Sequence, residues 1–169
     1  IWLLTGQRGQ SIKLIDIRNI KISKSCVKIS FGDLLKTSAP GKHQKEIKIL
    51  AYAPDRKLDI VTVVTEYLER TKTLRQGNQL FITTQKPFGP ASKDTIVRWI
   101  KRLMKLSGLD MNIFTPHSIR SSSTSKALKQ GVPLDTILRT AGWRRESTFR
   151  KYYQKLCQDQ SFSVGVLSK

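Results

Sequence analysis

The spacing of apolar residues predicts a chain of several helices with one small sheet. Apolar positions at helical spacing predict helices over residues 10–20, from Pro54 and Asp55 onward, and over 92–108, 116–130, 133–140 and from 147 or 148 onward. Residues 26–31 and 46–50 alternate between apolar and polar side chains, and turn residues precede the second segment. We therefore expect an α+β fold, mostly α, with a small antiparallel sheet or hairpin whose tip is basic.

Two of the expected helices have clear apolar faces. Ser92 is a suitable N-cap for the long helix that ends at Gly108. Its expected apolar stripe is formed by Ile96, Val97, Ile100, Leu103 and Met104, with Trp99 at the edge. The helix introduced by Pro54 and Asp55 is expected to bury Leu58, Val61, Val64, Tyr67 and Leu68.

Composition predicts a single globular domain inside the cell. The 169 residues are 38% hydrophobic and 25% charged, which is enough to bury one core. No run of 18 apolar residues is present, so we expect no membrane span. Cys26 and Cys157 are too far apart to resemble a metal pair, and so few cysteines fit a reducing compartment. The start at Ile1, without a methionine, predicts a fragment of a longer protein.

The net charge of +19 indicates a polyanionic partner, with nucleic acid ahead of an anionic membrane. Residues 1–48 carry +7 and residues 98–155 carry +10, whereas residues 49–97 are nearly balanced. Such asymmetry within one domain favours a docking surface over a uniformly solvated one. Nucleic acid is therefore the expected partner, with no small-molecule substrate.

The most informative short motif is His117-Ser-Ile-Arg120. At positions i and i+3 of a helix, an imidazole and a guanidinium face the same way and can grip a phosphate while moving a proton. The chain has no glycine-rich phosphate loop and no cluster of metal-ligand residues, so we expect no cofactor, no metal and no nucleotide hydrolysis. By itself the motif also fits an ordinary surface pair.

Further residues extend this motif into a series. Thr5-Gly6-Gln7-Arg8 precedes it, as does Lys36, while Trp143 and Tyr152-Tyr153 follow. This order of Arg, Lys, His-x-x-Arg, Trp or His, and Tyr resembles the active-site order of the tyrosine recombinases, the phage-integrase-like enzymes, from about residue 3 to 155. Segments 3–10, 36–43, 95–101, 116–121 and 131–143 resemble most closely the Crypton-like and DIRS-like recombinases of eukaryotic mobile elements, or their host-captured descendants.

The resemblance implies a catalytic role for each matched residue. Arg8 and Arg120 would neutralise the charge that develops on a scissile phosphate. Lys36 would protonate the leaving 5′ oxygen, with its neighbours Lys42 and Lys45 as the alternatives, and His117 would assist proton transfer. Trp143 would donate its indole N–H or pack against the helix of the nucleophile.

Two adjacent tyrosines leave the nucleophile open. The step of nine residues from Trp143 found in many bacterial and phage relatives selects Tyr152, whereas the eukaryotic elements favour Tyr153, which is our expectation. Gln154-Lys155-Leu156 departs from the Lys/Arg-Pro ending associated with that group. The side chains expected to contact DNA are Lys42, His43, Lys45, Arg98, Lys101, Arg102, Arg144 and Arg145.

The resemblance implies a nuclear enzyme of DNA recombination and integration, which cleaves and rejoins strands through a 3′-phosphotyrosine without metal or ATP. Residues 1–157 would form the catalytic domain, preceded in the whole protein by a core-binding domain. Residues 158–169 would form a tail that docks on a neighbouring subunit of a synaptic oligomer. The alternatives are a host-captured, non-catalytic DNA-binding module and a type IB topoisomerase-like enzyme.

Overall fold

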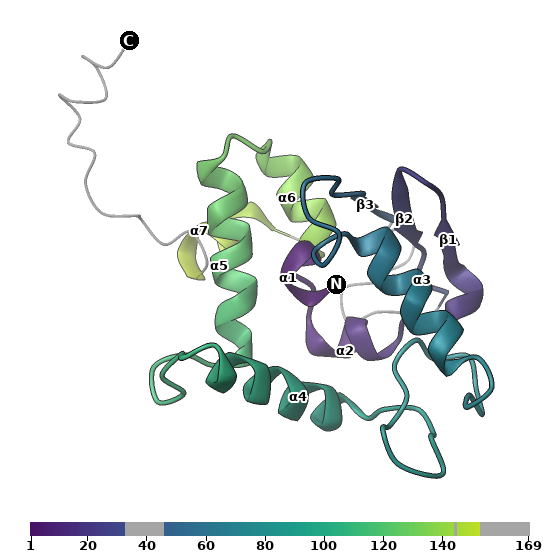
Figure 1. Ribbon diagram of the computed structural model, residues 1–169. Coiled ribbons are helices and arrows are strands. Elements are labelled where there is room, and N and C mark those ends of the chain that lie inside the picture. Colours follow the sequence, from purple (N-terminus) through teal and green to yellow (C-terminus); the bar gives the residue numbers. More distant parts are fainter. Residues whose placement is uncertain (33–45, 144, 153–169) are drawn as a thin grey trace, which may run out of the picture.

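The computed structural model describes residues 1–32, 46–143 and 145–152. Helices dominate, as expected, and the strands form one small antiparallel sheet (Figure 1). The helices are α1 (Trp2–Thr5), α2 (Gly9–Lys13), α3 (Ile60–Thr71), α4 (Lys93–Leu106), α5 (Pro116–Lys129), α6 (Leu134–Ala141) and α7 (Glu146–Tyr152), with a 3-10 turn at Ile17–Asn19. The predicted fold class is therefore confirmed.

The sheet has the strand order β1-β2-β3, with β1 at Ile20–Ile22, β2 at Cys26–Ile29 and β3 at Ile47–Leu50. The expected pairing of 26–31 with 46–50 is confirmed, because Val27 lies opposite Ile49. The helix expected over 10–20 is wrong: α2 ends at Lys13, and Ile20 opens β1, opposite Ile29. Asp16 is the N-cap of the 3-10 turn at Ile17–Asn19, and its side chain accepts a hydrogen bond from the Arg18 N–H. The expected hairpin tip lies outside the described residues.

The main core lies between the sheet and the helices α2, α3 and α4. Val27 and Ile29 of β2 are fully buried, and α3 lies against β2 and β3 (Figure 1). The other buried members of this core include Ile12, Ile15, Ile47, Ile60, Val64, Leu80 and Ile96. The core holds α2, and therefore the turn before it, at a fixed place beside α4.

Two expected helix details are wrong. The α3 helix begins after Asp59, whose carboxylate accepts hydrogen bonds from the N–H groups of Tyr52 and Thr62, so Leu58 precedes the helix and is exposed. These bonds lower the pKa of Asp59 to about 2. In α4, Ser92 caps the helix as expected, but Leu103 is exposed rather than part of the apolar stripe.

A second, smaller core joins α5, α6 and α7. Its buried residues are Ile137, Ala141, Trp143 and Phe149. The helices α5 and α6 match their expected ranges to within a residue, and α7 begins one residue before Ser147. Within the described part of the chain, no helix has the length and apolar character needed to cross a bilayer.

Candidate active site

The fold brings together two arginines that are far apart in sequence. Arg8 is the N-cap of α2, directly after the turn that links α1 to α2. Arg120 lies in the first half of α5 and is almost completely buried, with 1% of its surface exposed. Its Nη1 donates hydrogen bonds to the carbonyl oxygens of Gly6 and Ala141. Arg8 Nη1 donates to the carbonyl oxygen of Gly142, at 3.1 Å, so both arginines bind the end of α6.

The indole ring of Trp143 lies against the guanidinium groups of both arginines. The Arg120 guanidinium carbon lies 3.9 Å from the centre of the indole ring, and that of Arg8 lies 5.7 Å away. Both distances allow a cation–π attraction, which is strongest where water is excluded, and Trp143 is buried. Its other neighbour is Phe149 of α7, whose ring lies edge-on at 5.9 Å. Trp143 thus packs against Phe149 of the helix that ends at Tyr152.

His117 lies in the first turn of α5, one turn before Arg120, and its side chain is exposed. Partial loss of hydration lowers the pKa of His117 below its ordinary value of 6.5, and the positive charges of Arg120 and Arg8 lower it further. At neutral pH the imidazole is therefore uncharged, with one nitrogen able to accept a proton.

We expect this pKa to be measurable by NMR and to respond to DNA. The chain has two histidines, so His43→Gln leaves only the His117 ring resonances to titrate, with a midpoint below 6.5. A duplex added at constant salt should raise the midpoint, because a neighbouring phosphate favours the charged imidazolium. A midpoint above 6.5 in the free protein would contradict the described environment of His117.

Gly6 lets the α1–α2 turn approach α5 and α6 closely. Its φ of 59° lies in the left-handed region, where a side chain is strained. A Cβ at this position would lie 3.0 Å from Cγ2 of Thr124 and 3.4 Å from Cβ of Ala141. The turn can therefore present the Gly6 carbonyl to Arg120 only because the residue is glycine.

Gln7 is the site residue that sequence reasoning did not single out. It is 2% exposed, and its Nε2 donates a 2.6 Å hydrogen bond to the carbonyl oxygen of Thr140. It stands inside the Thr-Gly-Gln-Arg motif, but a glutamine next to an arginine resembles a solvated surface residue. Its position directly after Gly6, in a tight turn, was the signal in the sequence that could have indicated a buried polar residue.

The remaining predicted residues fall into two groups. Those outside the described residues are Lys36, Lys42, His43, Lys45, Arg144 and Tyr153. The others occupy stated positions on the surface or at a helix end: Arg98, Lys101 and Arg102 are exposed on α4, Arg145 is exposed before α7, and Tyr152 is the last residue of α7. The predicted pair of adjacent basic residues on α4 is therefore available to a ligand.

The fold is similar to that of several solved recombinases and integrases. It matches XerA recombinase with a TM-score of 0.68 and 20% identity, over 91% of this chain and 49% of that chain. A Tn1549 transposon integrase in complex with transposon right end DNA gives 0.65 and 15%, over 98% and 55%. A lambda integrase(75-356) dimer bound to a COC′ core site gives 0.55 and 20%, over 95% and 52%. The chain thus spans about half the length of these proteins.

None of the curated proteins matches the sequence. The family model described as the phage integrase family matches residues 1–158, which is nearly the whole chain. The matched range includes both arginines, the Trp143 indole that they contact, and the helix that ends at Tyr152. The chain therefore belongs to the phage integrase family, the tyrosine recombinases.

Proposed function

We propose that residues 1–157 are the catalytic domain of an enzyme that cleaves and rejoins DNA strands through a 3′-phosphotyrosine. The observation that carries this proposal is the meeting of Arg8 and Arg120 over Trp143, beside the helix that ends at Tyr152. Two fixed guanidinium groups can neutralise a phosphate at which negative charge develops. Membership of the phage integrase family supports the same chemistry.

In the proposed reaction, the phenolic oxygen of Tyr153 attacks the scissile phosphorus and forms a P–O bond. The bond from phosphorus to the 5′ oxygen breaks, and Lys36 gives that oxygen a proton, so that a 5′ hydroxyl leaves. The proton that the Tyr153 hydroxyl loses goes to His117, which is uncharged at neutral pH and can accept it. The 5′ hydroxyl of a partner strand then attacks the phosphotyrosine and releases the enzyme, so the reaction consumes no ATP.

Double-stranded DNA is the proposed partner. The Tn1549 integrase and the lambda integrase dimer are bound to transposon right end DNA and to a COC′ core site. In this chain, the exposed cations Arg98, Lys101 and Arg102 lie on α4, which leads through a loop to the first turn of α5 and His117. The α4 helix packs against α2 and α5, which carry Arg8 and Arg120, so phosphates bound along α4 would hold the duplex on an element that contacts both.

DNA binding should depend steeply on salt, because each neutralised phosphate releases counterions. We expect a slope of log affinity against log salt steeper than about −5, measured by fluorescence anisotropy. The double variant Lys101→Ala/Arg102→Ala should flatten the slope by about 2. Lys57→Ala, an exposed lysine in the nearly balanced segment, is the matched control and should leave it unchanged. A slope near about −1 for the unaltered protein would contradict phosphate binding.

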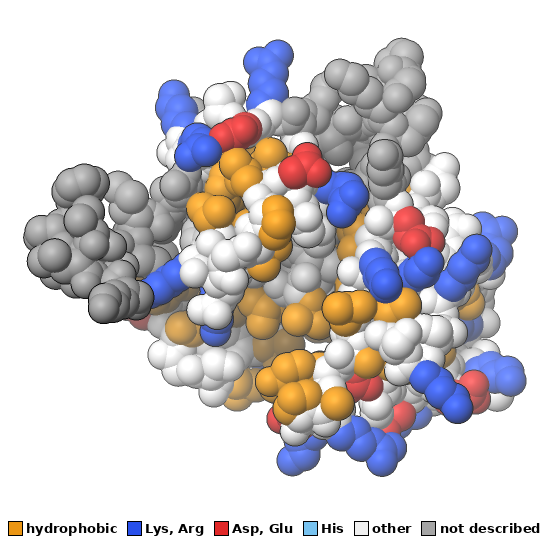
Figure 2. All heavy atoms as spheres, turned by 90° about the horizontal axis from the view of Figure 1, so that it is seen from above, with side chains coloured by type: hydrophobic (Ala, Val, Ile, Leu, Met, Phe, Trp, Pro, Cys, Tyr) orange, Lys and Arg blue, Asp and Glu red, His pale blue; other side chains and the backbone are white. Residues whose placement is uncertain are grey.

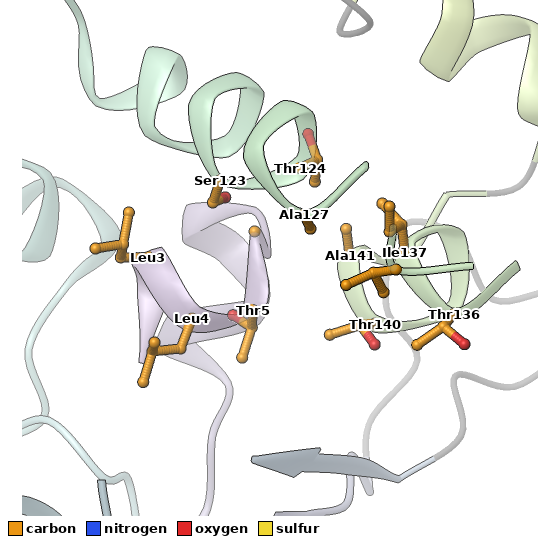
Figure 3. A pocket seen from close by; sticks show the side chains of 12 residues that line it. Leu3, Leu4, Thr5, Ser123, Thr124, Ala127, Thr136, Ile137, Thr140 and Ala141 are labelled. Carbon is orange, nitrogen blue, oxygen red and sulfur yellow. The ribbon is translucent and has the colours of Figure 1, made fainter. Parts of the chain in front are cut away.

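We also propose that the enzyme assembles on DNA as a synaptic oligomer, with residues 158–169 docking on a neighbouring subunit. An open groove between α1, α5 and α6 could receive them (Figure 3), and its volume is about 220 Å³. Leu3, Ala127, Val132 and Ile137 give it an apolar lining. Exposed apolar side chains also gather across one face of the molecule in Figure 2. The segment to be docked contains Phe162, Val164, Val166 and Leu167, and it lies outside the described residues.

The test of cleavage is covalent capture on a pool of nicked duplexes of random sequence, with EDTA present. After cleavage near the nick, the short released piece diffuses away and the enzyme stays linked to DNA. We expect a band that resists denaturant and disappears with protease, and sequencing of the captured DNA would give the target. DNA binding without a band would favour the host-captured, non-catalytic module. Relaxation of supercoiled plasmid without sequence preference would favour a type IB topoisomerase. An origin among eukaryotic mobile elements and a nuclear location remain part of this proposal.

A further inference from the structure

The carbonyl groups at the end of α6 accept hydrogen bonds from two kinds of donor, backbone N–H groups and side chains. Within the turn that ends the helix, the Arg139 carbonyl accepts a hydrogen bond from the Gly142 N–H, and the Leu138 carbonyl accepts one from the Trp143 N–H. The next three carbonyls, of Thr140, Ala141 and Gly142, accept from Gln7, Arg120 and Arg8 in that order. The last carbonyls of a helix have no partner within it and need one elsewhere. Here, side chains of the site supply the partners.

This arrangement places two guanidinium groups at the negative end of the α6 dipole. Each arginine can occupy its place only if the end of α6 stays at a fixed distance from the α1–α2 turn. In Figure 3, Thr140 and Ala141 of α6, Thr124 of α5 and Thr5 at the end of α1 line the same pocket. Gln7 is the residue of this turn that reaches α6 through an uncharged donor.

We propose that Gln7 is a positioning residue, which fixes the end of α6 against the α1–α2 turn so that Arg8, Arg120 and Trp143 keep their relative positions. The inference rests on the proposed function for its consequence in catalysis. A buried arginine or lysine at position 7 would add a third positive charge, whereas a leucine would leave the Thr140 carbonyl without a donor. A buried amide avoids both defects.

The test compares Gln7→Met, which keeps the length of the side chain but removes the donor, with Gln10→Met. Gln10 is exposed on α2, the helix that follows the turn, and serves as the matched control. On a captured target sequence at saturating DNA, Gln7→Met should slow single-turnover cleavage by about 10- to 100-fold, because small misplacements of catalytic groups are costly. The Kd for DNA should stay within about threefold, since phosphate contacts elsewhere carry the binding. Gln10→Met should match the unaltered protein.

A second substrate separates positioning from mere loss of structure. A methylphosphonate, in which a methyl group replaces one non-bridging oxygen, is neutral and needs less help from the arginines. The deficit of Gln7→Met should therefore shrink to within about threefold on this substrate. An equal deficit on both substrates would overturn the inference, because unfolded protein loses activity on each alike. If Gln7→Met does not fold, Gln7→Asn keeps the donor on a shorter side chain and should show an intermediate, substrate-dependent loss.

An NMR measurement decides the matter independently of cleavage. In Gln7→Met, the indole resonance of Trp143 and the guanidinium resonances of Arg8 and Arg120 should shift, while Trp99 on α4 serves as the unshifted reference. If these site resonances stay in place, the inference fails even in an active enzyme. If the unaltered protein forms no covalent adduct but the resonances shift, the cleavage proposal fails and the positioning role of Gln7 stands.

Discussion

Tyr153→Phe should abolish the covalent protein–DNA adduct. The substitution keeps the aromatic ring and removes only the oxygen that attacks the phosphate, so no phosphotyrosine can form. DNA affinity should stay within about threefold, because one hydroxyl contributes little beside the many phosphate contacts. The measurement is the denaturant-resistant band on a captured target sequence, with EDTA in every reaction.

Tyr152→Phe is the matched control, since it removes the same atom one position earlier, at the last residue of α7. Adjacent residues point in different directions in any regular backbone, so only one hydroxyl can reach the phosphorus. Tyr152→Phe should leave the band mostly intact. The reverse result would move the nucleophile by one residue and keep the mechanism. A band that survives both substitutions would exclude tyrosine at either position as the nucleophile.

Arg120→Ala should lower the single-turnover rate of cleavage by about 10² to 10³, the usual effect of losing one donor to a developing anion. DNA binding should change by only a few-fold, because Arg120 is buried and the basic surface of α4 remains. The exposed Arg139 of α6 supplies a control: Arg139→Ala should leave the rate unchanged.

The burial of Arg120 makes a second readout necessary. Alanine leaves the carbonyls of Gly6 and Ala141 without their donor and opens a space beside Trp143, so the variant should also unfold at a lower temperature. Added methylguanidinium can fill that space and restore the charge. Partial recovery of cleavage would assign the loss to chemistry. If DNA binding falls in proportion to cleavage and methylguanidinium has no effect, Arg120 has a structural role only.

Local patterns predicted the helices that begin and end with clear signals. Ser92 starts α4, and Pro116 and Pro133 mark the starts of α5 and α6, because capping and proline geometry act within a few residues. The error at residues 10–20 has a different origin. Ile12 and Ile15 are buried at helical spacing, but Ile20 is drawn into pairing with Ile29, a contact that no local pattern contains.

At the site, too, the sequence motifs indicated the side chains but not their distant partners. The order of motifs identified Arg8, His117, Arg120 and Trp143, and the structure brings the two arginines onto the indole. The backbone carbonyls that hold them were beyond prediction, because every residue has one and only tertiary packing selects which are used. Gln7 was missed for the same reason: its partner is the Thr140 carbonyl, 133 positions away.

These long separations also affect how the protein is made. Arg8 and its acceptor Gly142 are 134 positions apart, and synthesis at about 5 to 20 residues per second puts about 7 to 27 seconds between them. Until then the first arginine has neither its carbonyl acceptor nor the indole that follows it. A nascent chain that has not yet reached Gly142 therefore carries many of the basic side chains but lacks the assembled pair of arginines on the indole.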